Sequence, residues 1–236
     1  MKILITGDSH SAALNLGLMQ LRATGQTDAE VDILVKQLGG GHLLPTPFFN
    51  DVGTHAEIAD PAYRKSFGFL PPKAAHFDAI GLSMPLWPMR VVHQLVWGDL
   101  SLATRSPDRR PISHAAFRQI VLQDQRYVLQ LAELLARVGV TPIAISGPGL
   151  FRDHAVLRVV TAEHVLAIFN AYRAIMIAEL ARRDVTIINI PAVCLDADGF
   201  MNPDFRHDDA KDHHHANAAF GALMIQAVQD WARTQS

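Results

Sequence analysis

Residues 1–10 of the chain read Met-Lys-Ile-Leu-Ile-Thr-Gly-Asp-Ser-His. The apolar run from Ile3 to Ile5 favours a short buried strand, and Gly7 ends it. Leucines then recur at helical spacing at Leu14, Leu18 and Leu21. We therefore expect Ser9 where a strand turns into the start of a helix, and the unpaired backbone N–H groups of a helix start can stabilise negative charge on an attacked carbonyl oxygen.

A serine at this place is a weak nucleophile unless a base removes its proton. Residues 212–217, directly before the last helical pattern, read Asp-His-His-His-Ala-Asn. Asp212 lies three residues before His215, so its carboxylate can hold one ring nitrogen of this histidine while the other faces Ser9. We predict that Ser9 is the nucleophile, His215 the general base and Asp212 the acid that orients the base.

These two motifs, Gly-Asp-Ser after a first strand and Asp-x-x-His-x-Asn before a last helix, resemble those of the SGNH (GDSL) hydrolase superfamily. The resemblance spans nearly the whole chain. It implies an esterase, lipase, thioesterase or carbohydrate deacetylase with Ser9, Asp212 and His215 as catalytic residues. It also implies that the glycine turn at 39–41 gives a backbone N–H to the oxyanion hole, and we expect Gly40 to be the donor.

The resemblance fails in the loop after the third expected strand. The superfamily has Gly-x-Asn-Asp there, with the asparagine donating to the oxyanion, whereas residues 83–88 read Ser-Met-Pro-Leu-Trp-Pro. Loss of one such donor costs about 2.7–4 kcal/mol of transition-state stabilisation. His93 and Asn50 are conceivable substitutes. We expect Trp87 to offer the substrate an apolar wall or a face for stacking on a sugar.

Strand and helix patterns alternate along the chain. We expect strands at 31–38, 78–84, 141–146 and 185–190, besides the first, and helices at 113–138, at 161–183 and after Asn217, the expected N-cap of the last helix. This alternation predicts an α/β fold, a three-layer α/β/α sandwich around a five-stranded parallel sheet in the flavodoxin-like order 2-1-3-4-5. Ligands of such sheets bind at the carboxyl ends of the strands, where both motifs are expected to emerge.

Two long segments, around 41–77 and 85–111, interrupt the alternation. We expect one SGNH-hydrolase-like domain over residues 1–236, with these segments as irregular insertions. Both follow strands at the edge where the site is expected, so they can form the walls or lid of a pocket. The alternative is that their aromatic residues only anchor long loops to the core.

The composition excludes several classes of protein. The 236 residues are 49% apolar, enough for a substantial core, and a net charge of −2 gives no electrostatic reason to expect binding to nucleic acid or to an anionic membrane. The single cysteine, Cys194, excludes an internal disulfide and a cysteine-based metal cluster. We expect neither a signal peptide nor an apolar run that spans a bilayer, and hence a cytoplasmic protein.

Three functional hypotheses follow. The first is a serine hydrolase that cleaves an acyl ester of a carbohydrate or small metabolite through an acyl-enzyme, without a cofactor. The second is an O-acyltransferase acting on a saccharide hydroxyl, because Gly-Asp-Ser-His also resembles the opening motif of SGNH domains that acetylate polysaccharides. The third is a metal or ligand binder, suggested by the histidines and aspartates of residues 207–215. Adjacent histidines on one loop cannot easily aim at one ion, so we assign no metal site.

Each candidate residue also has an ordinary alternative role. Asp8 is expected to cap the first helix in addition to shaping the turn, and Ser9 can be a second capping hydroxyl. His215 can be a solvated loop histidine, since the chain contains 12 histidines. The glycine turn at 39–41 can be merely flexible.

Overall fold

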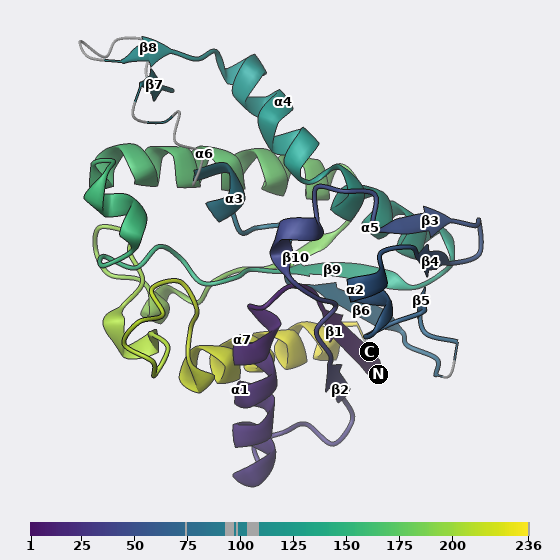
Figure 1. The fold of residues 1–236 in the computed structure, drawn as a ribbon. Helices are drawn as coiled ribbons and strands as arrows, with labels where there is room; N and C mark the ends of the chain where they lie inside the picture. Colours follow the sequence, from purple (N-terminus) through teal and green to yellow (C-terminus); the bar gives the residue numbers. More distant parts are fainter. Residues whose placement is uncertain (74, 93–96, 98, 103–108, 236) are drawn as a thin grey trace.

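A five-stranded parallel sheet forms the centre of the computed structural model (Figure 1). The order β10-β9-β6-β1-β2 corresponds to 2-1-3-4-5 when these strands alone are numbered, so the predicted topology is confirmed. The structure describes residues 1–73, 75–92, 97, 99–102 and 109–235. The strands of the sheet are β1 (Lys2–Thr6), β2 (Asp32–Val35), β6 (Ala79–Leu82), β9 (Thr141–Ile145) and β10 (Thr186–Ile188).

Helices cover both faces of this sheet and complete the predicted three-layer sandwich (Figure 1). Along β1, Ile3 and Ile5 point to the face covered by α1 and α7, whereas Leu4 belongs to the core on the opposite face. This alternation follows from the two-residue period of a strand. The helices are α1 (Ser11–Ala23), α2 (Pro61–Arg64), α3 (Met89–Val92), α4 (His114–Asp124), α5 (Arg126–Arg137), α6 (Ala162–Ala181) and α7 (Ala218–Arg233), with short 3-10 turns at Gly41–Leu43, Ala155–Arg158, Ala192–Cys194 and Pro203–Phe205.

The helices α1 and α7 meet backbone to backbone. A Cβ atom added to Gly17 would lie 2.1 Å from the backbone N of Ala222, and one added to Gly221 would lie 1.8 Å from the carbonyl oxygen of Ala13. Only glycine permits such an approach at both positions. Because Ser9 precedes α1 and His215 precedes α7, this contact brings the two sequence motifs to the same end of the sheet.

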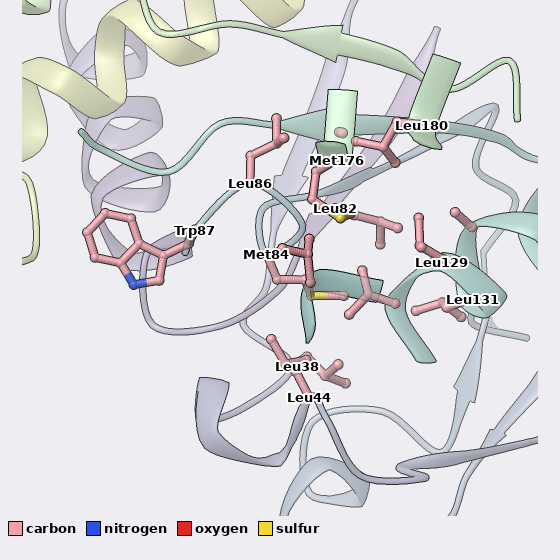
Figure 2. Packing of buried hydrophobic residues seen from close by; sticks show 14 of the residues in the cluster. Leu38, Leu44, Leu82, Met84, Leu86, Trp87, Leu129, Leu131, Met176 and Leu180 are labelled. Atoms are coloured by element: carbon pink, nitrogen blue, oxygen red, sulfur yellow. The ribbon is translucent and has the colours of Figure 1, made fainter. Parts of the chain in front are cut away.

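The core on the opposite face is built from leucines, methionines and aromatic residues of β6, α5 and α6. Figure 2 shows Leu82 and Met84, at the end of β6, among the leucines of α5 and the side chains of Met176 and Leu180 of α6. Trp87 lies at the edge of this group. The core therefore extends from the middle of the sheet to the loop where the superfamily asparagine is missing.

The segment 41–77 contains a small antiparallel sheet, which the sequence did not predict. It consists of β3 (Phe49–Asp51), β4 (Ala56–Ile58) and β5 (Phe69–Leu70), and its strands are too short to show a period. In the segment 85–111, β7 (Leu100–Ser101) pairs with β8 (Arg110–Pro111). His93 and residues 103–108 of this segment lie outside the described residues.

Two expectations about helices were wrong. The helix expected over 113–138 is two helices, α4 and α5, separated at Gln125, whose φ and ψ are −102° and 7°. The side chain of Gln125 is fully buried and donates to Asp124 Oδ2 at 2.9 Å and to the hydroxyl of Tyr172 at 2.7 Å. The N-cap of α1 is His10 and not Asp8. Asn217 does cap α7, since its Oδ1 accepts from the N–H of Phe220 at 3.2 Å.

One helix, α6, is long and apolar enough to cross a membrane by length and composition, with a mean hydropathy of 1.3 over an 18-residue window. The expectation that no apolar run reaches this length was therefore wrong. In the structure α6 lies against the sheet, where Val165, Ile168, Tyr172 and Met176 are buried. Packing on the sheet accounts for the apolar character of this face.

Candidate active site

The structure brings the three predicted site residues together. His215 Nε2 lies 2.8 Å from Ser9 Oγ, across 206 residues of sequence, and His215 Nδ1 lies 2.7 Å from Asp212 Oδ2. If Nδ1 carries the ring proton and donates it to Asp212, Nε2 is free to accept the hydroxyl proton of Ser9. This arrangement is the hydrogen-bonded chain that activates a serine.

Asp212 is fixed by its own loop. Its Oδ1 accepts the backbone N–H groups of His214 at 3.1 Å and His215 at 3.0 Å. Burial opposes ionisation, but the hydrogen bonds from the backbone and ring of His215 outweigh it and hold the pKa of Asp212 well below its ordinary value. Asp212 therefore stays ionised and can stabilise a positive charge on His215.

The turn that carries Ser9 depends on a close approach between the ends of β1 and β6. A Cβ on Gly7, which has a φ of +157°, would lie 2.2 Å from Ser83 Oγ. The buried Asp8 then ties the turn together, because its Oδ1 accepts from the backbone N of His10 at 3.1 Å and contacts the ring Nδ1 of His10 at 2.8 Å. Burial raises the pKa of Asp8, but the contact with His10 outweighs it and the net direction is downward.

A pocket of about 190 Å³ opens at Ser9. Trp87 forms part of its wall, but only 4% of this residue is exposed, and its ring lies 4.3 Å from that of His10. Trp87 therefore supplies an apolar wall rather than a free stacking face. The lining residues are Asp8, Ser9, His10, Gly41, His42, Trp87, Arg90 and His214.

Comparison with known proteins adds to this geometry. No family model and no curated protein matches the sequence. Solved structures do match, including a GDSL-like lipase from Bacteroides thetaiotaomicron, at 10% identity over 99% of this chain and 88% of that chain with a TM-score of 0.51. A protein from Desulfitobacterium hafniense, assigned to the lipolytic G-D-S-L family, matches at 10% identity over 97% of this chain and 98% of that chain with a TM-score of 0.52.

The chain has the SGNH hydrolase fold. At these identities the comparison establishes the fold alone. Ser9 follows β1, and the Asp212–His215 loop precedes α7, as the two sequence motifs predict.

Of the glycine turn expected to serve the oxyanion hole, Gly41 and not Gly40 lines the pocket. The carbonyl oxygen of Gly40 accepts a hydrogen bond of 2.6 Å from the hydroxyl of Tyr63. This contact holds the turn at Gly40. A Cβ on Gly41 would lie 3.1 Å from Asp8 Oδ2, so this glycine also allows the turn to approach the Ser9 loop closely.

The place of the usual SGNH asparagine is occupied by the loop after β6. Among the described residues that line the pocket there is no side-chain amide. Asn50 lies on β3, where it pairs with Glu57, and does not line the pocket. Arg173 of α6 holds the loop instead, by donating to the carbonyl of Leu86 at 3.3 Å and to Ser146 Oγ at 3.2 Å.

Sequence reasoning missed one charged residue of the pocket, Arg90. Its Nε and Nη2 each donate to the carboxylate of Asp124 at 2.9 Å. A single arginine in a segment without periodicity gives no signal in the sequence, and its partner lies 34 residues further along the chain. Only the three-dimensional structure places it beside Ser9.

The loop that carries Asp212 and His215 also has residue types that bind metal ions. Ligand atoms of Asp212, His214 and His215 lie within 4.8 Å of one another. However, the ring nitrogens of His215 already contact Asp212 and Ser9, so an ion held by all three residues would have to displace the Ser9 contact or the Asp212 contact. Metal binding and serine activation are therefore competing uses of these side chains.

Proposed function

We propose that this protein is a serine hydrolase that cleaves an acyl ester through an acyl-enzyme intermediate. The observation that carries the proposal is the continuous hydrogen-bonded chain from Asp212 through His215 to Ser9, at the carboxyl end of a strand in the SGNH fold. A histidine placed between a carboxylate and a serine hydroxyl is the arrangement that makes this hydroxyl a nucleophile.

In the first half of the reaction, His215 Nε2 takes the proton of Ser9 as its Oγ attacks the carbonyl carbon of the ester. The tetrahedral intermediate collapses when the imidazolium gives this proton to the departing alcohol oxygen, which leaves Ser9 acylated. In the second half, His215 takes a proton from water, the resulting hydroxide attacks the acyl carbon, and the proton returns to Ser9. Asp212 stays ionised throughout and stabilises the imidazolium.

We place the oxyanion hole at the backbone N–H groups of Ser9 and Gly41. Ser9 lies two residues before Ser11, the first residue of α1. Gly41 lines the same pocket as the first residue of a 3-10 turn, where backbone N–H groups lack intrahelical partners. Among the described residues that line the pocket there is no side-chain amide, so the oxyanion of the tetrahedral intermediate receives one hydrogen bond fewer and forms less readily on an unactivated ester. Esters with good leaving groups, such as p-nitrophenyl acetate, should therefore react far better than ethyl acetate.

The size of the pocket favours a small acyl group. A volume of about 190 Å³ at Ser9 suits an acetyl group or one slightly larger, and Trp87 closes the wall with an apolar surface. We therefore propose short-chain esters, acetyl esters first, of a small metabolite or a saccharide as substrates.

Transfer to a saccharide hydroxyl is the second candidate. The observation in its favour is a further cavity of about 580 Å³, which shares Arg90 with the pocket at Ser9 and carries Gln119 and Gln123 in its lining. Amide side chains of this kind can hydrogen-bond a polyol acceptor. Both functions share the acyl-enzyme and differ only in whether water or a sugar hydroxyl attacks it.

Labelling with a fluorophosphonate probe tests the proposal. We expect the wild-type protein and Ser66→Ala to be labelled and to hydrolyse p-nitrophenyl acetate, and Ser9→Ala to do neither. Hydrolysis by Ser9→Ala at the wild-type rate would contradict the proposal. Product analysis with and without an added sugar then separates hydrolysis from transfer.

A further inference from the structure

Arg90 is the one lysine or arginine among the described residues that line the pocket at Ser9. It also lines the neighbouring cavity of about 580 Å³. Arg90 therefore belongs to the wall of the pocket at Ser9 and also to the wall of this larger cavity. If the acyl group occupies the smaller pocket, Arg90 lies where the alcohol part of an ester would pass into the larger one.

The guanidinium is held in place before any ligand binds. Asp124 accepts from two of its nitrogens, and Asp124 Oδ2 also accepts from the hydroxyl of Tyr172 at 3.0 Å and from Gln125 Nε2 at 2.9 Å. Tyr172 and Gln125 are both fully buried. An arginine fixed in this way loses little rotamer entropy when it binds a further group.

The third nitrogen, Nη1, is directed to the side of Gly41. It lies 3.5 Å from the position that a Cβ atom on residue 41 would take. Because residue 41 is glycine, no side chain of this residue fills the space beside Nη1. Nε and Nη2 donate to Asp124, whereas Nη1 is left on the side of the pocket wall that Gly41 forms.

The charges around Arg90 limit how strongly it can attract an anion. Burial lowers its pKa, but the contact with Asp124 outweighs burial and raises it, so the guanidinium stays protonated. Asp124 balances this charge. Asp8 is a second nearby carboxylate: its Oδ1 is engaged by His10, and its Oδ2 lies 3.1 Å from the same Cβ position of residue 41 that Nη1 approaches. Recognition would therefore come from directed N–H groups more than from net charge, and its effect should be moderate.

We propose that Arg90 binds an anionic group, a carboxylate or a phosphate, on the alcohol part of the substrate. The inference rests on the proposed esterase function and narrows the substrates to short-chain esters of small acidic alcohols. A hydrogen bond to an ionised group is worth more than a neutral one, which corresponds to a preference of roughly tenfold or more for the anionic ester.

Two matched pairs of acetate esters test this. One compares 4-acetoxybenzoate with its methyl ester, and the other compares 4-acetoxyphenyl phosphate with 4-methoxyphenyl acetate. The ratio of kcat/KM within each pair is measured for wild type and for Arg90→Gln, so that differences in leaving-group reactivity cancel. We expect the ratio to fall roughly tenfold or more in Arg90→Gln for at least one pair, and the pair affected identifies the anion.

Two further variants separate recognition from a structural role. Arg137→Gln removes an arginine from another Arg–Asp pair, with Asp51 at the surface, and should keep the wild-type ratios. Asp124→Asn loosens the guanidinium but also removes the carboxylate that balances its charge; these effects oppose each other, so this variant should keep the preference for the anion. An unchanged ratio in Arg90→Gln, equal losses on both esters of each pair, or the same loss of preference in Asp124→Asn would each overturn the inference.

Failure of the proposed esterase function can be distinguished from failure of the anion site at Arg90. If the wild-type protein hydrolyses none of the four esters, esterase activity is contradicted, and the anion site is then judged by binding alone. Calorimetry with 4-hydroxybenzoate and with 4-hydroxyphenyl phosphate would compare Ser9→Ala with Ser9→Ala/Arg90→Gln. Tighter binding of either anion to the protein that retains Arg90 supports the anion site, and equal binding of both anions overturns it.

Discussion

The helices on the two faces of the sheet are joined in opposite ways. On one face, α1 and α7 meet at Gly17 and Gly221 with no side chain between their backbones. On the other, side chains lie between the helices: Phe117 of α4 and Met176 of α6 belong to one buried apolar cluster, and Arg118 of α4 forms a polar link with Glu179 of α6. A backbone contact leaves no rotamers to adjust, so it suits the face that positions Ser9 and His215. Side chains can change rotamer, so contacts of this kind tolerate small displacements of the helices, while the two hydrogen bonds to Asp124 hold the arginine that we assign to substrate recognition.

The largest expected effect is on activity and concerns the first face of the sheet, which α1 and α7 cover. His215→Ala should lower kcat by roughly 10⁴- to 10⁶-fold, because it removes the base of a unit whose members act together. Asp212→Asn should cost less, because the base remains while its orientation is disturbed. Steady-state kinetics with p-nitrophenyl acetate measures both. A His215→Ala protein within tenfold of wild type would show that the chemistry does not depend on this face.

The second effect is on stability and tests the backbone contact itself. Gly17→Ala would place a Cβ atom 2.1 Å from the backbone of α7, so the two helices must separate. We expect the free energy of unfolding to fall by about 3 kcal/mol or more, as for severe overpacking. Gly68→Ala is the control, because nothing lies within 4 Å of its Cβ position. Urea unfolding of both variants gives the comparison, and equal stabilities would refute the close contact.

The smallest effect concerns the polar links. Arg118, Arg182 and Arg183 all pair with Glu179, whose side chain is 6% exposed. Burial raises the pKa of Glu179, but the hydrogen bonds from Arg183 and Arg118 outweigh it, so the pKa lies below its ordinary value. We expect Glu179→Gln to lower the free energy of unfolding at pH 7 by about 1–2 kcal/mol.

The sign of the pH dependence follows from the direction of this shift. A carboxyl group with a lowered pKa in the folded state contributes stability above its unfolded pKa of ~4.3, and loses this contribution as pH falls through the folded value. The stability difference between wild type and Glu179→Gln should therefore shrink below pH ~4. Asp198→Asn, which affects an exposed pair with Arg152, is the control and should show little difference at any pH. A constant difference for Glu179→Gln would contradict the shift.

Much of the first face could be predicted from sequence, because its determinants are local. Strand β1, the turn at Ser9 and the amphipathic helix α7 each follow from residues within one element, and alternation of elements fixed the strand order. The contact between Gly17 and Gly221 could not be predicted, since two glycines far apart in sequence show no local pattern. The structure supplies the reason why the two motifs meet.

On the second face the determinants are not local, and the sequence was correspondingly less informative. At the break between α4 and α5, Gln125 donates to Tyr172, 47 residues away, while the helical period of apolar residues continues across the break. Arg90 acquires its place from Asp124 on another helix. The sequence also does not distinguish Gly40 from Gly41 as the glycine that lines the pocket, because three consecutive glycines carry no side chain that would mark one of them.

The contact between α1 and α7 also has a consequence during synthesis. Ser9 leaves the ribosome more than two hundred residues before His215, the histidine whose ring contacts its hydroxyl. Until α7 has been synthesised, Gly17 of α1 has no helix to pack against, and the site remains unassembled. The protein should acquire its reactivity in one late step, when α7 docks, so a fluorophosphonate probe should leave stalled chains that lack this helix unlabelled.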